Sequence, residues 1–111
     1  MWIKALTPVL QAQVEQRILA HAAKIFPTKA EQIRVRFTST SGFDYCYIDA
    51  DEGKGLPAAH LCRLGWRGNL ESWDLAFYTY SNERYQPCVY GTGEPLGTPE
   101  EALEVGIVYL G

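Results

Sequence analysis

A histidine and three cysteines are the residues of this chain with the most reactive side chains. The expected strand pattern places all four on one face of a sheet, and this residue combination suits Zn²⁺: His60, Cys62, Cys46 and Cys88. Cys88 would lie two strands from His60, and strands are about 4.8 Å apart, which is too far for ligand bonds of about 2 Å to one ion. No two cysteines have the C-x-x-C spacing of a structural zinc site either. We therefore predict no metal site, and interpret these residues as buried thiols and a hydrogen-bonded core histidine.

The same residues suggest nucleophilic catalysis, with Cys62 as nucleophile and His60 as base. Residues i and i+2 of a strand are about 6.7 Å apart, which is beyond hydrogen-bonding distance. His21, on a predicted helix, could approach a cysteine, but nothing in the sequence favours that pair. Asp49 and Asp74 have arginine partners in the expected sheet, and such pairing lowers a carboxyl pKa, which does not suit a general acid. We assign no catalytic residue and no cofactor, and leave open whether the chain is an enzyme.

Three glycines precede a predicted helix start and suggest a phosphate-binding loop, because exposed amides and the helix dipole favour anions. They are Gly91, Gly93 and Gly97, and their spacing matches neither the dinucleotide nor the Walker fingerprint. Glu94 and Glu101 would also place negative charge where the phosphate would sit. We interpret the segment as a capped turn.

A second group of residues alternates along the predicted strands and faces away from the core. Tyrosine and arginine are enriched in contact hot spots, and this face stays open if both helices cover the other one. The candidate binding residues are Arg34, Arg36, Tyr45, Tyr47, Arg63, Tyr78 and Tyr80, with Leu61 and Tyr85 beside them.

An amphipathic helix is predicted at the N-terminal end. Thr7 suits the N-cap and Pro8 the first helical position. Between Pro8 and Pro27, which should end the helix, apolar residues recur at helical spacing: Leu10, Val14, Ile18, Ala22 and Ile25.

From Ile33 the apolar residues alternate with polar ones, which predicts a strand over residues 33–38 and a second one over 43–50. A Ser41–Gly42 turn pairs Phe37 with Cys46, Val35 with Ile48 and Ile33 with Ala50 on the core face. The outer pairs are then Arg36 with Tyr47, a cation–π contact, and Arg34 with Asp49, an ion pair.

The segment 59–81 is predicted to form a hairpin around a Gly68–Asn69 turn. The expected core-face pairs are Leu64 with Trp73, Cys62 with Leu75 and His60 with Phe77, and the outer pairs are Arg63 with Asp74 and Ala59 with Tyr78. A last strand over 85–90 would pair Cys88 with Phe77, Tyr90 with Leu75 and Tyr85 with Tyr80, and Pro87 suits an edge.

A C-terminal helix is predicted from Thr98, which forms a capping-box pattern with Glu101. Its apolar stripe is Ala102, Leu103, Gly106, Ile107 and Leu110, but Val105, Val108 and Tyr109 are apolar too. This helix therefore needs two neighbours: the sheet, and either the first helix or a second subunit. The alternative is a sixth strand over Val105 to Leu110.

The composition suits one globular domain, residues 1–111. The hydrophobic fraction is 47% and no apolar run approaches the roughly 20 residues of a membrane helix. The start of the chain lacks a signal-peptide pattern and the three cysteines are odd in number, so we expect a cytoplasmic protein with reduced thiols. A net charge of −3 gives no long-range attraction to polyanions.

The sequence predicts an α+β fold: a five-stranded antiparallel meander with an N-terminal and a C-terminal helix on one face. The predicted function is a small interaction module, homodimeric or bound to another protein, that uses the Tyr/Arg face or the C-terminal helix. One alternative is single-stranded nucleic-acid binding on the same face, although the acidic balance favours a protein. Another is a small enzyme with a pocket near His21, His60 and Cys62. In a third, the tyrosines only stabilise the sheet.

Overall fold

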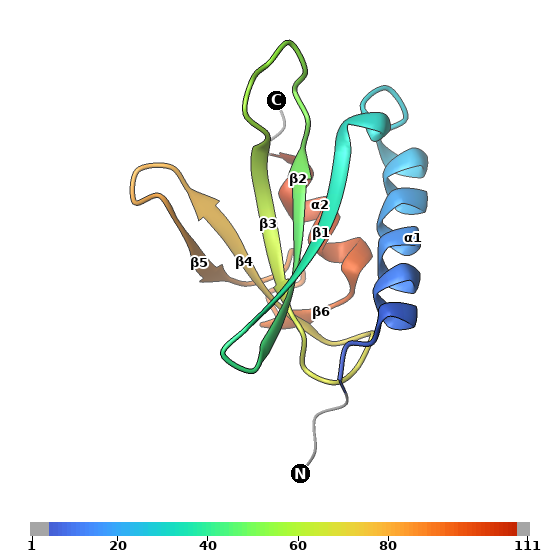
Figure 1. The fold of residues 1–111 in the computed structure, drawn as a ribbon, viewed down its shortest axis with the longest axis vertical. Coiled ribbons are helices and arrows are strands. Elements are labelled where there is room, and N and C mark those ends of the chain that lie inside the picture. The colour runs from blue at the N-terminus through green and yellow to red at the C-terminus, as the bar shows by residue number, and fades with distance from the viewer. Residues whose placement is uncertain (1–4, 109–111) are drawn as a thin grey trace.

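The computed structural model describes residues 5–108 and contains two α-helices and a six-stranded antiparallel sheet (Figure 1). The helices are α1 (Pro8–Ile25) and α2 (Pro99–Ile107), with a short 3₁₀ helix η1 (Ala30–Gln32) after α1. The strands are β1 (Ile33–Thr40), β2 (Phe43–Ala50), β3 (Ala59–Gly65), β4 (Trp73–Thr79), β5 (Arg84–Cys88) and β6 (Leu96–Gly97). The first five strands follow one another in space as they do in sequence, which confirms the predicted α+β meander.

Helix α1 begins and packs as its sequence predicts. The Thr7 side chain accepts a hydrogen bond from the Leu10 N–H at 3.3 Å, and Pro8 occupies the first turn, where its missing N–H is not needed. Val14, Ile18 and Ala22 are fully buried. The helix ends at Ile25, just before Pro27.

The β1–β2 hairpin has the predicted register at every pair. Phe37 lies opposite Cys46 and Arg36 opposite Tyr47. Ser41 (φ 53°) and Gly42 (φ 81°) both have left-handed backbones. A two-residue hairpin turn needs positive φ at both central residues when its twist matches the right-handed twist of the two strands.

The β3–β4 hairpin differs from the prediction by two residues. Leu64 pairs with Leu75, and Cys62 with Phe77, because β3 ends at Gly65 and residues 66–72 form a longer loop than the predicted Gly68–Asn69 turn. Arg63 therefore lies opposite Ala76, and the predicted Arg63–Asp74 pair is wrong. A shift by an even number leaves each of these side chains on its predicted face.

The β4–β5 register shifts in the same way. The observed pairs are Leu75 with Cys88, Phe77 with Gln86, and Tyr78 with Tyr85. Tyr85 thus faces Tyr78 rather than Tyr80. Tyr90 lies beyond β5, where its hydroxyl donates to the Trp73 carbonyl at 2.7 Å.

A β-bulge in β3 reverses the predicted faces of Ala59, His60 and Leu61. Ala59 pairs with Ala50 of the core face, so the predicted Ala59–Tyr78 pair is wrong. Ile48 pairs with Cys62 and Asp49 with His60, so Leu61 is the extra residue on β3. Leu61 is only 2% exposed and lies beside Gly106 of α2. His60 lies on the outer face of the sheet, so its predicted core position is wrong.

Helix α2 has the predicted capping box. The Thr98 side chain accepts from the Glu101 N–H, and the Glu101 carboxylate accepts from the Thr98 N–H. The alternative of a strand from Val105 is wrong for residues 105–107, which are helical; residues 109 and 110 lie outside the described part. The sixth strand is instead β6, in which Gly97 pairs with Trp73 of β4.

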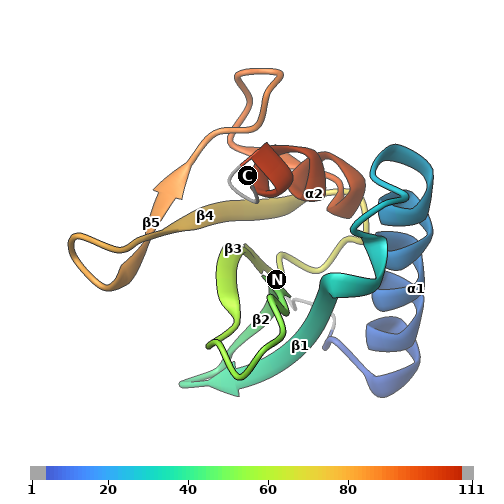
Figure 2. The same cartoon turned by 90° about the horizontal axis from the view of Figure 1, so that it is seen from above.

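Both helices lie on the same face of the sheet and pack against each other, with α1 next to β1 and α2 next to β3 and β4 (Figure 2). Two side-chain links join the helices: Arg17 to Glu100 at 2.7 Å, and His21 to Glu104 at 2.7 Å. The core between the layers includes Ile18, Ile48, Cys62, Leu64, Trp73 and Leu103. No helix within residues 5–108 is long and apolar enough to cross a membrane.

Candidate functional site

The outer face of the sheet is strongly concave. The rings of Tyr47 in β2 and Tyr85 in β5 lie 5.2 Å apart between centroids. These strands are three positions apart in the sheet, which is about 14 Å when a sheet is flat. Figure 1 shows β4 and β5 splayed away from β1 to β3. The sheet therefore curls around its outer side chains.

The side chains inside this curve form one connected group, which we call the Tyr/Arg cluster. Its members are Arg36, Tyr45, Tyr47, Asp49, His60, Arg63, Tyr78 and Tyr85. Most ring pairs meet at a steep angle, such as Tyr78 and Tyr85 at 5.2 Å and 69°. Edge-to-face contact of this kind stabilises aromatic pairs by about 0.5–1.5 kcal/mol beyond burial. The cluster thus acts as a second, polar core.

Asp49 is the buried charge of the cluster, at 5% exposure. Its carboxylate accepts from Arg36 Nε at 2.8 Å and lies 3.1 Å from His60 Nδ1. Burial is the largest single influence on Arg36 and acts to lower its pKa, but the hydrogen bond to Asp49 and the nearby charges together outweigh it, and the net pKa is raised. The predicted Arg34–Asp49 ion pair is wrong, because Arg34 instead pairs with Asp51 at 3.3 Å. The predicted cation–π contact of Arg36 with Tyr47 is confirmed at 4.0 Å.

Arg63 holds the central position on β3 and differs from the other arginines of the face. Its guanidinium lies 4.3 Å from the Tyr45 ring centroid and 5.3 Å from that of Tyr85. Its Nε is buried, and within residues 5–108 it has no hydrogen-bond partner. Asp74, its predicted partner, contacts Arg67 instead, at 3.4 Å. The cluster thus contains an arginine held by aromatic rings alone.

Tyr85 has a second buried polar atom of this kind. Its hydroxyl has no hydrogen-bond partner in the described part of the chain. Burial, followed by the charge of Asp49, raises the pKa of the phenol well above its usual range. Tyr85 therefore stays neutral on this face.

The predicted binding residues do not all meet in the cluster. Tyr80 lies at its margin, 63% exposed, where its hydroxyl accepts from the His60 N–H at 3.0 Å. Arg34 lies apart, next to Asp51. The prediction left out Asp49 and His60. Leu61 and Cys62, two apolar residues in succession, were the sequence signal for the bulge that brings His60 to this face.

Two adjoining cavities border the cluster and share Tyr45 and Asp74. One has a volume of about 550 Å³ and is also lined by Phe43, Asp44, Trp66 and Arg67. The other, about 230 Å³, is lined by Arg63 and two prolines. Asp74 reaches over Gly65, where a Cβ would lie 2.2 Å from its Oδ1. The absence of a side chain at Gly65 thus leaves room for the Asp74 carboxylate.

The cysteine candidates lie on the other side of the sheet. Cys46 and Cys62 are fully buried, and burial raises the pKa of both thiols. Cys62 Sγ donates to the Ala102 carbonyl at 3.6 Å, so it faces α2 and not His60. A Cys62–His60 pair is therefore excluded by the geometry. Among residues 5–108, no three His, Cys, Asp or Glu side chains are grouped as metal ligands.

The glycine-rich segment before α2 uses its own amides. The Tyr90 N–H donates to the Glu94 carbonyl at 2.9 Å, and the Gly93 N–H to the Tyr90 carbonyl at 2.8 Å. These bonds close a tight turn, so they support the predicted capped turn over a phosphate loop.

Comparison with known proteins gives no relative. No family model, curated protein or solved structure matches this chain. The chemistry of the site is therefore the basis for function. The site combines tyrosines in edge-to-face contact, a buried Asp49, and an arginine whose Nε has no acceptor within residues 5–108.

Proposed function

We propose that this protein is a small cytoplasmic binding module, and that it contacts a protein partner through the concave outer face of its sheet. The observation that carries the proposal is Arg63, whose guanidinium lies beside two rings and whose buried Nε has no acceptor within residues 5–108. Arginine stays charged in proteins, and a desolvated donor without a partner costs free energy. Arg63 is only partly buried, so a carboxylate of a partner could pair with the part of the guanidinium that the rings leave accessible.

The rest of the face supports the same proposal. Tyr45 and Tyr85 hold the Arg63 side chain in place, which reduces the conformational entropy that binding would cost. Tyr80 and Phe43, both 63% exposed, offer aromatic surface at its margins. The free thiols of the chain are consistent with a reducing compartment.

A second copy of the chain is the first partner to test. The Asp44 side chain lines the larger cavity and has no ion pair in the described residues. In a two-fold interface each contact between two different residues occurs twice, once from each copy to the other. Arg63 of each copy could then face Asp44 of the other.

A protein fits this face better than a single-stranded nucleic acid does. Base stacking needs free flat ring faces, whereas Tyr47 and Tyr85 meet at 70° and Tyr78 and Tyr80 at 79°. Arg36 is also engaged by Asp49. These contacts leave little surface on which successive bases could stack.

The test compares Arg63→Met with Arg84→Met. Arg84 is exposed at the start of β5, so its replacement removes the same charge from the sheet without touching the cluster. Light scattering over a concentration series measures self-association, and the absorbance ratio of the same peak reports bound nucleic acid. Immobilised full-length protein then captures partners from cell extract, which mass spectrometry identifies.

If the proposal is right, Arg63→Met should raise the dissociation constant of self-association or partner binding at least tenfold. Arg84→Met should leave it unchanged. The tenfold change follows from removal of one partner of a buried, charged hydrogen bond. Circular dichroism confirms that both variants fold. A monomer that retains no protein, or a partner retained equally by both variants, would contradict it. Co-eluting nucleic acid that Arg63→Met releases would replace the protein partner with a nucleic acid.

A further inference from the structure

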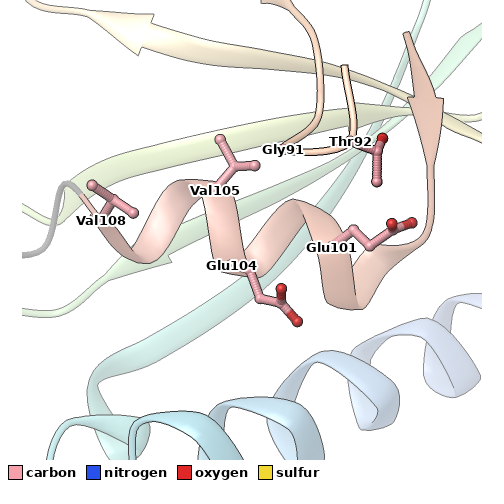
Figure 3. A pocket seen from close by; sticks show the side chains of 6 residues that line it. All are labelled: Gly91, Thr92, Glu101, Glu104, Val105 and Val108. Carbon is pink, nitrogen blue, oxygen red and sulfur yellow. The ribbon is translucent and has the colours of Figure 1, made fainter. Parts of the chain in front are cut away.

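Another cavity, of about 390 Å³, lies on the helical side of the molecule, between α2 and the turn after β5 (Figure 3). Its lining residues are Gly91, Thr92, Glu101, Glu104, Val105 and Val108. The Tyr/Arg cluster contributes no residue to this lining. The cavity is therefore separate from the site proposed above.

The floor of this cavity is a partly uncovered apolar side of α2. Val105 and Val108 lie on it; Val105 is partly buried against the core, and Val108 is 74% exposed. The opposite side of α2 is the buried one, with Ala102, Leu103 and Gly106 against the sheet and α1. The sequence predicted a helix that is apolar on two sides, and within residues 5–108 α1 and the sheet cover only one of them.

The charge of the cavity has one sign. Glu101 and Glu104 line it, and no lysine or arginine does. Glu101 accepts two hydrogen bonds from Thr98 through Oε1, at 2.9 and 3.1 Å, so its Oε2 is free of partners in the described chain. Glu104 contacts His21 through Oε2, which likewise leaves Oε1.

The positions of these residues fit a long cationic side chain. Glu101, Val105 and Val108 are spaced i, i+4 and i+7, so they lie along one face of α2, and Thr92 lies across from Glu101 in Figure 3. Lysine and arginine bury an aliphatic stem on apolar surface and keep the charged end near an acceptor. A stem over the two valines would bring its cation to Glu101.

We propose that this cavity is a docking site for a lysine or arginine side chain of a partner protein. The stem packs on Val105 and Val108, and the cation pairs with Glu101. An acidic side chain is disfavoured by repulsion from both glutamates, and a purely apolar one would leave Glu101 without a cation.

The test is an NMR titration of the methyl-labelled full chain with Nα-acetyl-lysine N-methylamide. Its matched probe is the norleucine analogue, which has the same stem and no cation. Saturable shifts of the Val105 and Val108 methyl signals are expected with the lysine probe, and weaker binding with norleucine. Glu101→Gln should weaken the lysine probe about two- to fivefold, the range of an exposed ion pair.

Glu101→Gln is a clean variant because glutamine at this position keeps the capping box. Glu52→Gln, in the exposed loop after β2, removes the same charge elsewhere and should change nothing. Val108→Gln, at an exposed position, tests the apolar floor and should weaken both probes.

Three outcomes would overturn the proposal. One is the absence of saturable shifts at the two valines. Another is norleucine binding as tightly as lysine, which would make the cavity merely apolar. The last is binding only by a chain shortened by residues 109–111, which would show that the protein's own C-terminal residues fill the cavity.

Discussion

The Tyr47 ring in β2 touches the Tyr85 ring in β5, although two strands lie between them. The contact closes the outer face over Arg63, whose guanidinium lies beside Tyr85. Residues that a flat sheet would leave in solvent are thereby partly buried, and Asp49 almost completely. The outer face is therefore both a binding surface in our proposal and a part of what stabilises the fold.

The buried hydroxyls of Tyr85 and Tyr90 should respond to the same substitution in opposite ways. Tyr85 has no hydrogen-bond partner in the described chain, whereas Tyr90 donates to the Trp73 carbonyl at 2.7 Å. Tyr85→Phe keeps the ring and removes an unpaired hydroxyl, so the free energy of unfolding should stay constant or rise by up to about 1 kcal/mol. Tyr90→Phe leaves a buried carbonyl unpaired and should lower it by about 1–2 kcal/mol.

Urea unfolding followed by tryptophan fluorescence measures both values. Tyr85→Ala, which removes the ring as well, should cost about 2–4 kcal/mol. If Tyr85→Phe lowers the free energy of unfolding as much as Tyr90→Phe does, the Tyr85 hydroxyl has a hydrogen-bond partner and its burial does not destabilise the native state.

The Asp74 carboxylate depends on the missing side chain of Gly65. A Cβ at this position would lie 2.2 Å from Asp74 Oδ1 and 2.7 Å from its Cγ. Gly65→Ala should therefore displace Asp74 from Arg67, and because this partly exposed carboxylate can turn aside, the free energy of unfolding should fall by at most about 1 kcal/mol.

A double variant separates this clash from other effects. Gly65→Ala with Asp74→Ala should recover most of the loss, because the clashing atoms are gone. Gly91→Ala is the matched control, since a Cβ there meets no atom within 4 Å. Equal destabilisation of the single and the double variant in urea would show that the cost has another origin.

The sequence predicted the topology better than the detailed pairing. The Ser41–Gly42 turn follows local rules, and the β1–β2 register is correct throughout. The longer loop after β3 depends instead on a tertiary contact, in which Trp66 packs on Trp73 at 4.9 Å. Alternation alone counted Trp66 as part of a strand, so the predicted turn was too short.

The candidate site was predicted in part for the same reason. The face of each tyrosine and arginine followed from alternation, which survives a shift by two residues. The bulge at Leu61 changes that alternation by one, and it turned His60 outward. The contact of Tyr47 with Tyr85 depends on how far the sheet curls, which no local pattern determines.

The three thiols should react in a definite order. Cys46 and Cys62 are fully buried, and burial raises both pKa values, so little of the reactive thiolate forms. Cys88 is only half-buried, although burial raises its pKa too. Iodoacetamide at pH 8 should therefore modify Cys88 first in the folded protein, and the other two only in urea.

Peptide mass spectrometry over a time course distinguishes the three sites. Cys88→Ser should show almost no modification under native conditions and two modifications after unfolding. Native labelling of Cys46 or Cys62 at the rate of Cys88 would mean that the layer between sheet and helices opens readily.

Acid should weaken the link between the helices through Glu100. Its carboxylate accepts two hydrogen bonds from Arg17, at 2.7 and 2.8 Å, and this pairing lowers its pKa from an ordinary value of about 4.5. A carboxyl with a lower pKa when folded stabilises the protein fully above its unfolded pKa. That contribution is lost as the pH falls through the folded pKa, because protonation breaks the ion pair.

Glu100→Gln should thus be less stable than the native chain at pH 7, by about 1 kcal/mol for a pair that is partly exposed. The gap should begin to narrow as the pH falls below about 4.5, and it should close as the pH falls through the lower folded pKa of Glu100, where the native side chain is protonated as well. Urea unfolding from pH 7 to pH 3 measures it, with Glu52→Gln as a control for the loss of one exposed carboxylate. A difference in stability that stays constant across this range would mean that Glu100 contributes through packing, because acid removes the ion pair but leaves the packing of the side chain unchanged.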